Sequence, residues 1–148
     1  VYPKGQRIEL DISQLLLDGS ILREKDFREQ LKNHSWEQYQ DCYIALTNKN
    51  EAILPAWAFM LLTIQLSPFA KKVYIGTLGQ LETLLYSEII AAIDVNDFKD
   101  KSIIIKGCAN KPIPENAFIL LTQKLQPIVK SVMYGEACSS VPLFKKKK

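Results

Sequence analysis

An internal repeat is the feature that most constrains the fold, because one stretch of the sequence matches another stretch 59 residues further on. Residues 41–76 align with residues 100–135 without a gap, and 13 of the 36 aligned positions are identical. The identities include Pro55 with Pro114. A fixed internal period is typical of a supersecondary unit that occurs more than once, so both stretches predict the same local structure.

Each copy predicts a strand, a helix and a second strand. Short apolar runs are typical of strands, a proline is favoured in the first turn of a helix, and the residue before a proline avoids the helical conformation. An amphipathic pattern predicts one more helix before each of the two aligned stretches. The expected helices are 24–33, 55–66, 81–93 and one that opens at Pro114, and the expected strands are 43–46, 73–75, 102–105, 132–134 and an edge strand at 7–12.

This alternation predicts an α/β fold with a mainly parallel sheet, helices on both of its faces, and a tandem α-β-α-β repeat. The chain of 148 residues has the usual length of one domain, so we expect a single domain over residues 1–148. Its expected parts are a strand and turn segment at 1–22, the first copy at 23–79, the second copy at 80–138 and a tail at 139–148.

The charge of the chain is concentrated at one end. Four lysines, Lys145 to Lys148, account for the formal net charge of +3, and the rest carries 15 basic and 16 acidic residues. A nucleic-acid-binding domain usually has a basic face, so we expect no nucleic acid on the folded body and a solvated, mobile lysine tail. Residues 52–70 lack charge, but Pro55 and Pro68 leave too short a helix to span a membrane.

Two of the three cysteines are the candidate functional site. Cys108 and Cys138 each follow a predicted strand by a few residues, and ligands bind outside the carboxyl ends of parallel strands. If these strands are neighbours, about 5 Å apart, the thiols could meet. Basic groups lower a thiol pKa, and the flanking polar residues are Lys106, Lys111, Glu136 and Ser139. Cysteine is also a common core residue, so simple packing is the alternative.

The other cysteine and the one histidine point to structural roles. Cys42 opens a strand at the opposite edge of the sheet, and His34 ends a helix, where the helix dipole favours its charge. An odd number of cysteines is not a disulfide framework and fits a reducing cytoplasm. The sequence has no dinucleotide-binding glycine motif, no Walker loop and no nucleophile elbow.

The predicted helix at 55–66 is apolar on nearly every side, which is typical of a helix that is buried all round. A domain of this size has few elements to cover the second side of such a helix. We therefore expect a homodimer that forms through or near this helix, with the interface candidates Trp57, Phe59, Met60 and Ile64.

Several segments resemble an uncharacterised bacterial family known as domain of unknown function 2480. They include VYPKGQRIELDI, ILPAWAFML, IIIKGCANKPIPENAF and SVMYGEACSSVPLFKKKK, and the likeness extends over essentially the whole chain. Ala137 stands where the family pattern has proline. The resemblance implies no established activity, but it implies genes that lie near those for iron–sulfur cluster assembly.

Three functions remain open from the sequence. The first is a thiol- or metal-handling accessory protein, linked to iron–sulfur cluster assembly, in which Cys108 and Cys138 carry a persulfide, hold a transient metal or cluster, or exchange a disulfide. The second is a non-catalytic homodimeric adaptor that docks a protein partner. The third is a small-molecule site between the two repeat copies. No pattern in the sequence decides whether the protein is an enzyme.

Overall fold

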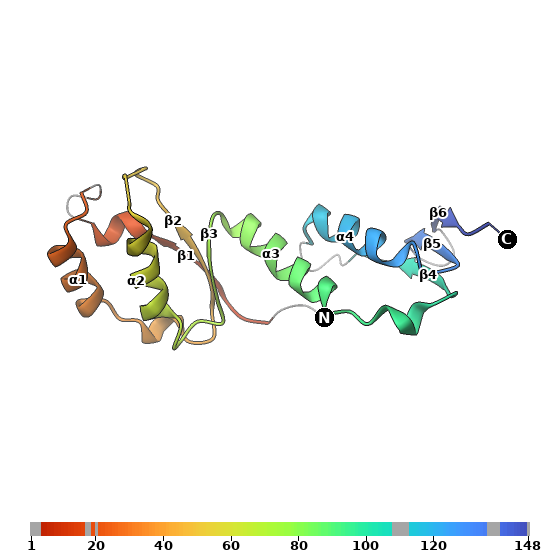
Figure 1. Cartoon of the computed structure of the whole chain (residues 1–148), viewed down its shortest axis with the longest axis horizontal. Coiled ribbons are helices and arrows are strands. Elements are labelled where there is room, and N and C mark those ends of the chain that lie inside the picture. Colours follow the sequence, from red (N-terminus) through yellow and green to blue (C-terminus); the bar gives the residue numbers. More distant parts are fainter. Residues whose placement is uncertain (1–3, 17–18, 20, 108–112, 136–139, 148) are drawn as a thin grey trace. The chain divides into compact units, whose positions relative to one another are not determined.

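The computed structural model describes residues 4–16, 19, 21–107, 113–135 and 140–147, which form two compact units (Figure 1). We call Tyr2–Leu81 the first unit and Glu82–Lys148 the second unit, and each is described by itself. The described residues contain four α-helices and two three-stranded sheets. The α/β class is therefore confirmed, but the strands form two sheets where the sequence predicted one. A single domain over residues 1–148 stays a prediction.

The sheet of the first unit is entirely parallel. It consists of β1 (Arg7–Asp11), β2 (Tyr43–Thr47) and β3 (Lys72–Ile75), in the order β1-β2-β3. Tyr43 lies opposite Arg7 on one side and opposite Lys72 on the other. The predicted edge strand at 7–12 is confirmed as β1.

Helices α1 (Glu24–Asn33) and α2 (Ala56–Leu66) link these strands and cover the same face of the sheet (Figure 1). Both crossovers step in the same direction across the sheet, and right-handed crossovers then place both helices on one side. This arrangement differs from the expected pair of helical layers. The buried side chains that form this core include Leu10, Phe27, Leu31, Ile44, Leu46, Ala58, Leu62 and Leu66.

Helix α3 (Leu78–Ala91) begins three residues before its predicted start at Leu81. Its first turn has a capping box, in which Thr77 Oγ1 accepts the amide of Gln80 at 3.1 Å and Gln80 Oε1 accepts the amide of Thr77 at 2.9 Å. This reciprocal pair satisfies two amides at the helix start. The capping box, which the apolar periodicity does not show, therefore sets the boundary.

The second unit has a mixed sheet. Strands β4 (Ser102–Ile105) and β5 (Ser131–Tyr134) are parallel, and β6 (Val141–Lys145) runs antiparallel to β5. Helix α4 (Glu115–Leu125) links β4 to β5. Ile105, Leu125, Val129 and Val132 form the buried core, against which Phe118, Leu121 and Phe144 pack.

The lysine run was expected to be mobile, but its first residue, Lys145, belongs to β6, which occupies residues 141–145 of the expected tail segment 139–148. The pairing of β6 with β5 has a register shift between Val132 and Met133. Pro142 is the second residue of β6. A proline within a sheet is tolerated on an edge strand or at a bulge. Because the segment contains a proline and ends in lysines, its sequence does not predict the strand that pairs with β5.

The matching sequence stretches adopt matching local conformations. Helices α2 and α4 both have 11 residues, and both of their ends are 59 residues apart. Asp41 and Asp100 both have a left-handed backbone, with φ of 60° and 59°. Their amides donate at 2.9 Å to the carbonyls of Phe69 and Ile128, respectively. No helix among the described residues is long and apolar enough to cross a bilayer.

Candidate functional site

The carboxyl ends of β4 and β5 lie side by side at one edge of the second sheet. Ile105, the last residue of β4, lies opposite Tyr134, the last residue of β5. Beyond them, the amide of Gly135 donates to the carbonyl of Ile105 at 2.9 Å. Because the strands are parallel neighbours, about 5 Å apart, the two following segments leave the sheet at the same edge.

These two exits approach closely at Gly107. A Cβ atom on Gly107 would lie 3.0 Å from the phenol oxygen of Tyr134 and 3.9 Å from the ring of Phe118. The rings of Phe118 and Tyr134 are 5.9 Å apart in an edge-to-face contact. Gly107 therefore lets the chain that follows β4 pass against the pair formed by Tyr134 at the end of β5 and Phe118 of α4.

Most of the predicted site residues lie just beyond these exits, outside the described residues. Of the thiol site, only Lys106 falls within the described part of the chain, where it is exposed. The residues that fall outside it are Cys108, Lys111, Glu136, Cys138 and Ser139.

Cys42 has the structural role that its position predicts. Its side chain is buried at the start of the first sheet, with 4% exposure, and its Sγ atom donates to the carbonyl of Gln40 at 3.4 Å. Cys42 is the one cysteine among the described residues, and its thiol is not part of a disulfide.

His34 is the residue that follows α1, as predicted for a helix-end histidine. Its Nε2 atom lies 2.6 Å from the phenol oxygen of Tyr39, and its ring lies 4.8 Å from the ring of Trp36. Burial lowers the pKa of His34 and raises the pKa of Tyr39. Both shifts favour the neutral forms of a polar pair that packs within the first unit, so the preference for charged His34 expected from the helix dipole is wrong.

The carboxyl edge of the first sheet contains a polar network that the sequence analysis missed. Asp11 Oδ1 accepts the amides of Ser13 at 3.0 Å and Lys49 at 3.1 Å. Ser13 Oγ accepts the amide of Asn50 at 3.2 Å. Burial raises the pKa of Asp11, but these hydrogen bonds and the nearby Lys49 charge outweigh it, so the net pKa is lowered. The network joins the segments that follow β1 and β2.

Lys49 has a second acidic partner in the same region. Its Nζ atom lies 2.7 Å from Glu9 Oε1, and this hydrogen bond raises the pKa of Lys49. The signal that could have revealed the network is the polar run 48–51 directly after β2, beside an aspartate that ends β1. In the part of the chain that the structure describes, no three His, Cys, Asp or Glu residues are grouped to hold a metal.

The family of the chain follows from its match to a family model described as "Protein of unknown function (DUF2480)", which extends over residues 1–146. The chain belongs to the DUF2480 family. This result confirms the family resemblance inferred from the sequence segments. No curated protein and no solved structure matches the chain. The DUF2480 description assigns no activity.

A second surface of this DUF2480 chain is the outer side of α2. Trp57, Met60 and Ile64 are exposed by 38%, 62% and 63%, respectively. Phe59, the remaining interface candidate, is partly buried and packs against the core of the first unit. The 11 residues of α2 include no charged side chain. The helix therefore presents an uncharged apolar stripe, which we define as Trp57, Met60 and Ile64.

Proposed function

We propose that this DUF2480 protein handles sulfur or a metal through a shared site of Cys108 and Cys138. The observation that supports the proposal is the in-register pairing of Ile105 with Tyr134. Cys108 is three residues beyond Ile105, and Cys138 is four residues beyond Tyr134. An extended chain spans about 3.3–3.6 Å per residue, so both cysteines are within reach of the same point near this sheet edge.

The close approach at Gly107 adds to the argument. The chain that leads to Cys108 passes the phenol of Tyr134 before either cysteine is reached. Lys106 supplies a cation next to this route, and a nearby cation favours the thiolate over the thiol. A thiolate pair is the form that attacks sulfur or binds a soft metal. The proposed roles are to carry a persulfide, hold a transient metal or iron–sulfur cluster, or exchange a disulfide.

The experiment is a metal analysis and free-thiol count on protein purified without oxygen. Three samples are compared with the wild type: Cys108→Ser, Cys138→Ser and the control Cys42→Ser. We expect bound metal or persulfide sulfur in the wild type and in the control, and its loss in each of the other two variants. Three ordinary thiols with no metal and no persulfide in the wild type would reject the persulfide and metal roles. Failure of the wild type to form a Cys108–Cys138 disulfide with an added disulfide reagent would reject the exchange role.

A second candidate function is a homodimeric adaptor, and the exposed stripe of α2 is the observation that favours it. Scattered exposed apolar residues are ordinary, but a contiguous apolar patch often marks an interaction site. A stripe without charge can pack against a second copy of itself without repulsion. We therefore propose a two-fold contact between the α2 helices of two chains, which would leave one partner-binding surface per subunit.

Molar mass in solution tests this second candidate. The paired substitution Met60→Lys and Ile64→Lys should convert a dimer to a monomer, because two lysines would be buried against two others. Ile119→Lys is a matched control, since Ile119 is a 56% exposed residue of α4 at the position 59 residues after Met60. A wild type that stays monomeric at micromolar concentration would exclude the contact.

A further inference from the structure

Three lysines lie side by side at one end of the second sheet, directly beyond the strands, although they are far apart in the sequence. The amide of Lys130 donates to the carbonyl of Lys101 at 2.8 Å, and the amide of Lys146 donates to the carbonyl of Lys130 at 2.8 Å. Neighbouring strands lie about 5 Å apart, so the three residues form one row across the end of the sheet. We call this row, together with the exposed neighbours Lys145 and Lys147, the lysine edge.

The lysine edge has little negative charge to balance it. Like charges directly opposite each other destabilise a sheet. Asp100 Oδ1 lies 3.7 Å from Lys146 Nζ, but both side chains are more than half exposed, and such surface pairs contribute little. The second unit has ten lysines, no arginine and seven acidic residues, whereas the first unit has nine basic and nine acidic residues. The positive charge of the chain therefore belongs to the unit that carries this edge.

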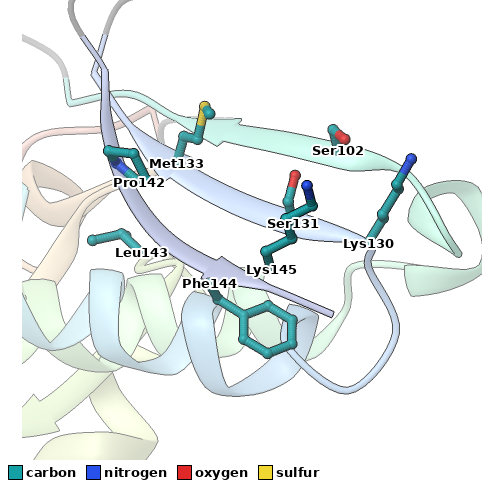
Figure 2. A pocket seen from close by; sticks show the side chains of 8 residues that line it. All are labelled: Ser102, Lys130, Ser131, Met133, Pro142, Leu143, Phe144 and Lys145. Carbon is teal, nitrogen blue, oxygen red and sulfur yellow. The ribbon is translucent and has the colours of Figure 1, made fainter. Parts of the chain in front are cut away.

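A shallow groove of about 470 Å³ lies beside the lysine edge (Figure 2). Ser102 lies opposite Ser131, which in turn lies opposite Lys145, so hydroxyl and ammonium groups cross the three strands in one row. Lys130 also lines the groove, as do the apolar side chains of Met133 and Pro142. Hydroxyls and ammonium groups donate hydrogen bonds to phosphate oxygens. The groove thus combines donors for an anionic group with an apolar wall.

Exposed aliphatic side chains continue from the groove along β6. Val141 is 56% exposed and Leu143 is 53% exposed, on the same strand as Lys145. Phe144, by contrast, packs into the core of the second unit. Lysines next to exposed aliphatic residues suit a membrane interface, where the cations meet anionic headgroups and the apolar groups enter the acyl boundary.

We infer that the lysine edge docks on an anionic phospholipid surface, with a headgroup phosphate in the groove and Val141 and Leu143 at the acyl boundary. A nucleic acid fits the same residues less well. Proteins that bind single strands stack bases on aromatic rings. The exposed ring nearest to this surface is that of Tyr134, which pairs with Val141 at the far end of β5 from the lysine edge. Base edges are most often read by arginine, which the second unit lacks.

Vesicle co-sedimentation tests the inference. The full chain is mixed with vesicles of phosphatidylcholine alone or of equimolar phosphatidylcholine and phosphatidylserine. We expect binding to the second kind only, and its loss when the salt rises from about 0.1 M to about 1 M, where the Debye length falls from about 10 Å to about 3 Å. If the wild type bound both kinds of vesicle equally, or bound neither, this result would be enough to reject the inference.

Two sets of variants locate the surface. Each lysine near an anionic membrane contributes a factor of roughly five to binding, so K101Q/K130Q/K145Q should weaken it roughly a hundredfold. The control K4Q/K25Q/K32Q makes the same change in net charge with exposed lysines of the first unit, and it should bind as the wild type does. Leu143→Ser should weaken binding without changing the salt dependence. An equal loss in the control, or tighter binding of a short oligonucleotide at the same salt concentration, would contradict the proposed partner.

Discussion

The imidazole Nε2 atom of His34 lies 2.6 Å from the phenol oxygen of Tyr39, and the two rings are stacked with their centres 5.7 Å apart. Burial lowers the pKa of His34 from its ordinary value of 6.5, so the folded chain binds this proton less readily than the unfolded chain. The groups that face the imidazole, Trp36, Tyr39 and the Gln38 amide, carry no charge. The pair therefore links the stability of the first unit to pH.

The first prediction is a loss of stability in mild acid. The contribution of neutral His34 is fully present above its unfolded pKa, and it decreases as the pH falls through 6.5 towards the lower folded pKa. The free energy of unfolding in urea should be smaller at about pH 5.5 than at about pH 8. The variant His34→Gln should show a flatter pH dependence over this range. An unchanged slope in the variant would assign the effect to other groups.

The second prediction concerns the packing of α2. Leu62 is fully buried in the first core, and its replacement by alanine should lower the free energy of unfolding by about 2–5 kcal/mol. Ile53 is 96% exposed, so Ile53→Ala should change the free energy of unfolding by less than about 0.5 kcal/mol. Chemical unfolding of both variants compares the two positions. Similar values for the two would mean that α2 packs differently from the structure.

Local patterns predicted the helices and most strands because their signals lie within short segments. The helix predicted at Glu24–Asn33 has the bounds of α1, and Pro55 and Pro114 stand directly before α2 and α4. Strand β6 was missed because its pairing with β5 is a contact between segments, and its lysines resemble those of a solvated end. The lysine edge was missed for the same reason, since only the β5–β6 pairing brings Lys146 to Lys130.

The candidate thiol site shows the same limit. The sequence predicted that the strands before Cys108 and Cys138 run parallel, and the pairing of β4 with β5 confirms this and shows that they are neighbours. The sequence did not predict the contact of Gly107 with Tyr134, because a glycine in a polar loop has many common explanations. Whether the two thiols meet stays a prediction, since both residues lie outside the described part of the chain.

The third prediction is protection of β6 from hydrogen exchange. The amide of Lys146 is hydrogen-bonded to Lys130, and residues 141–145 pair with β5. If local opening costs roughly 2 kcal/mol, exchange of these amides should be about thirtyfold slower than in an unstructured peptide. Exchange of the region measured by mass spectrometry at neutral pH tests this value. Exchange at the unstructured rate would restore the expectation of a mobile tail.

The fourth prediction is an energetic coupling between Gly107 and Tyr134. A Cβ atom at position 107 would lie 3.0 Å from the Tyr134 oxygen, which is closer than ordinary van der Waals contact. Gly107→Ala should therefore lower the free energy of unfolding by about 1 kcal/mol, because the ring must shift against Phe118. In the Tyr134→Phe background the phenol oxygen is absent, so Gly107→Ala should lower the free energy of unfolding by a smaller amount. A double-mutant cycle in urea measures this coupling. A cycle without coupling would show that the exits from β4 and β5 do not touch, and it would remove one support for a shared thiol site at this edge.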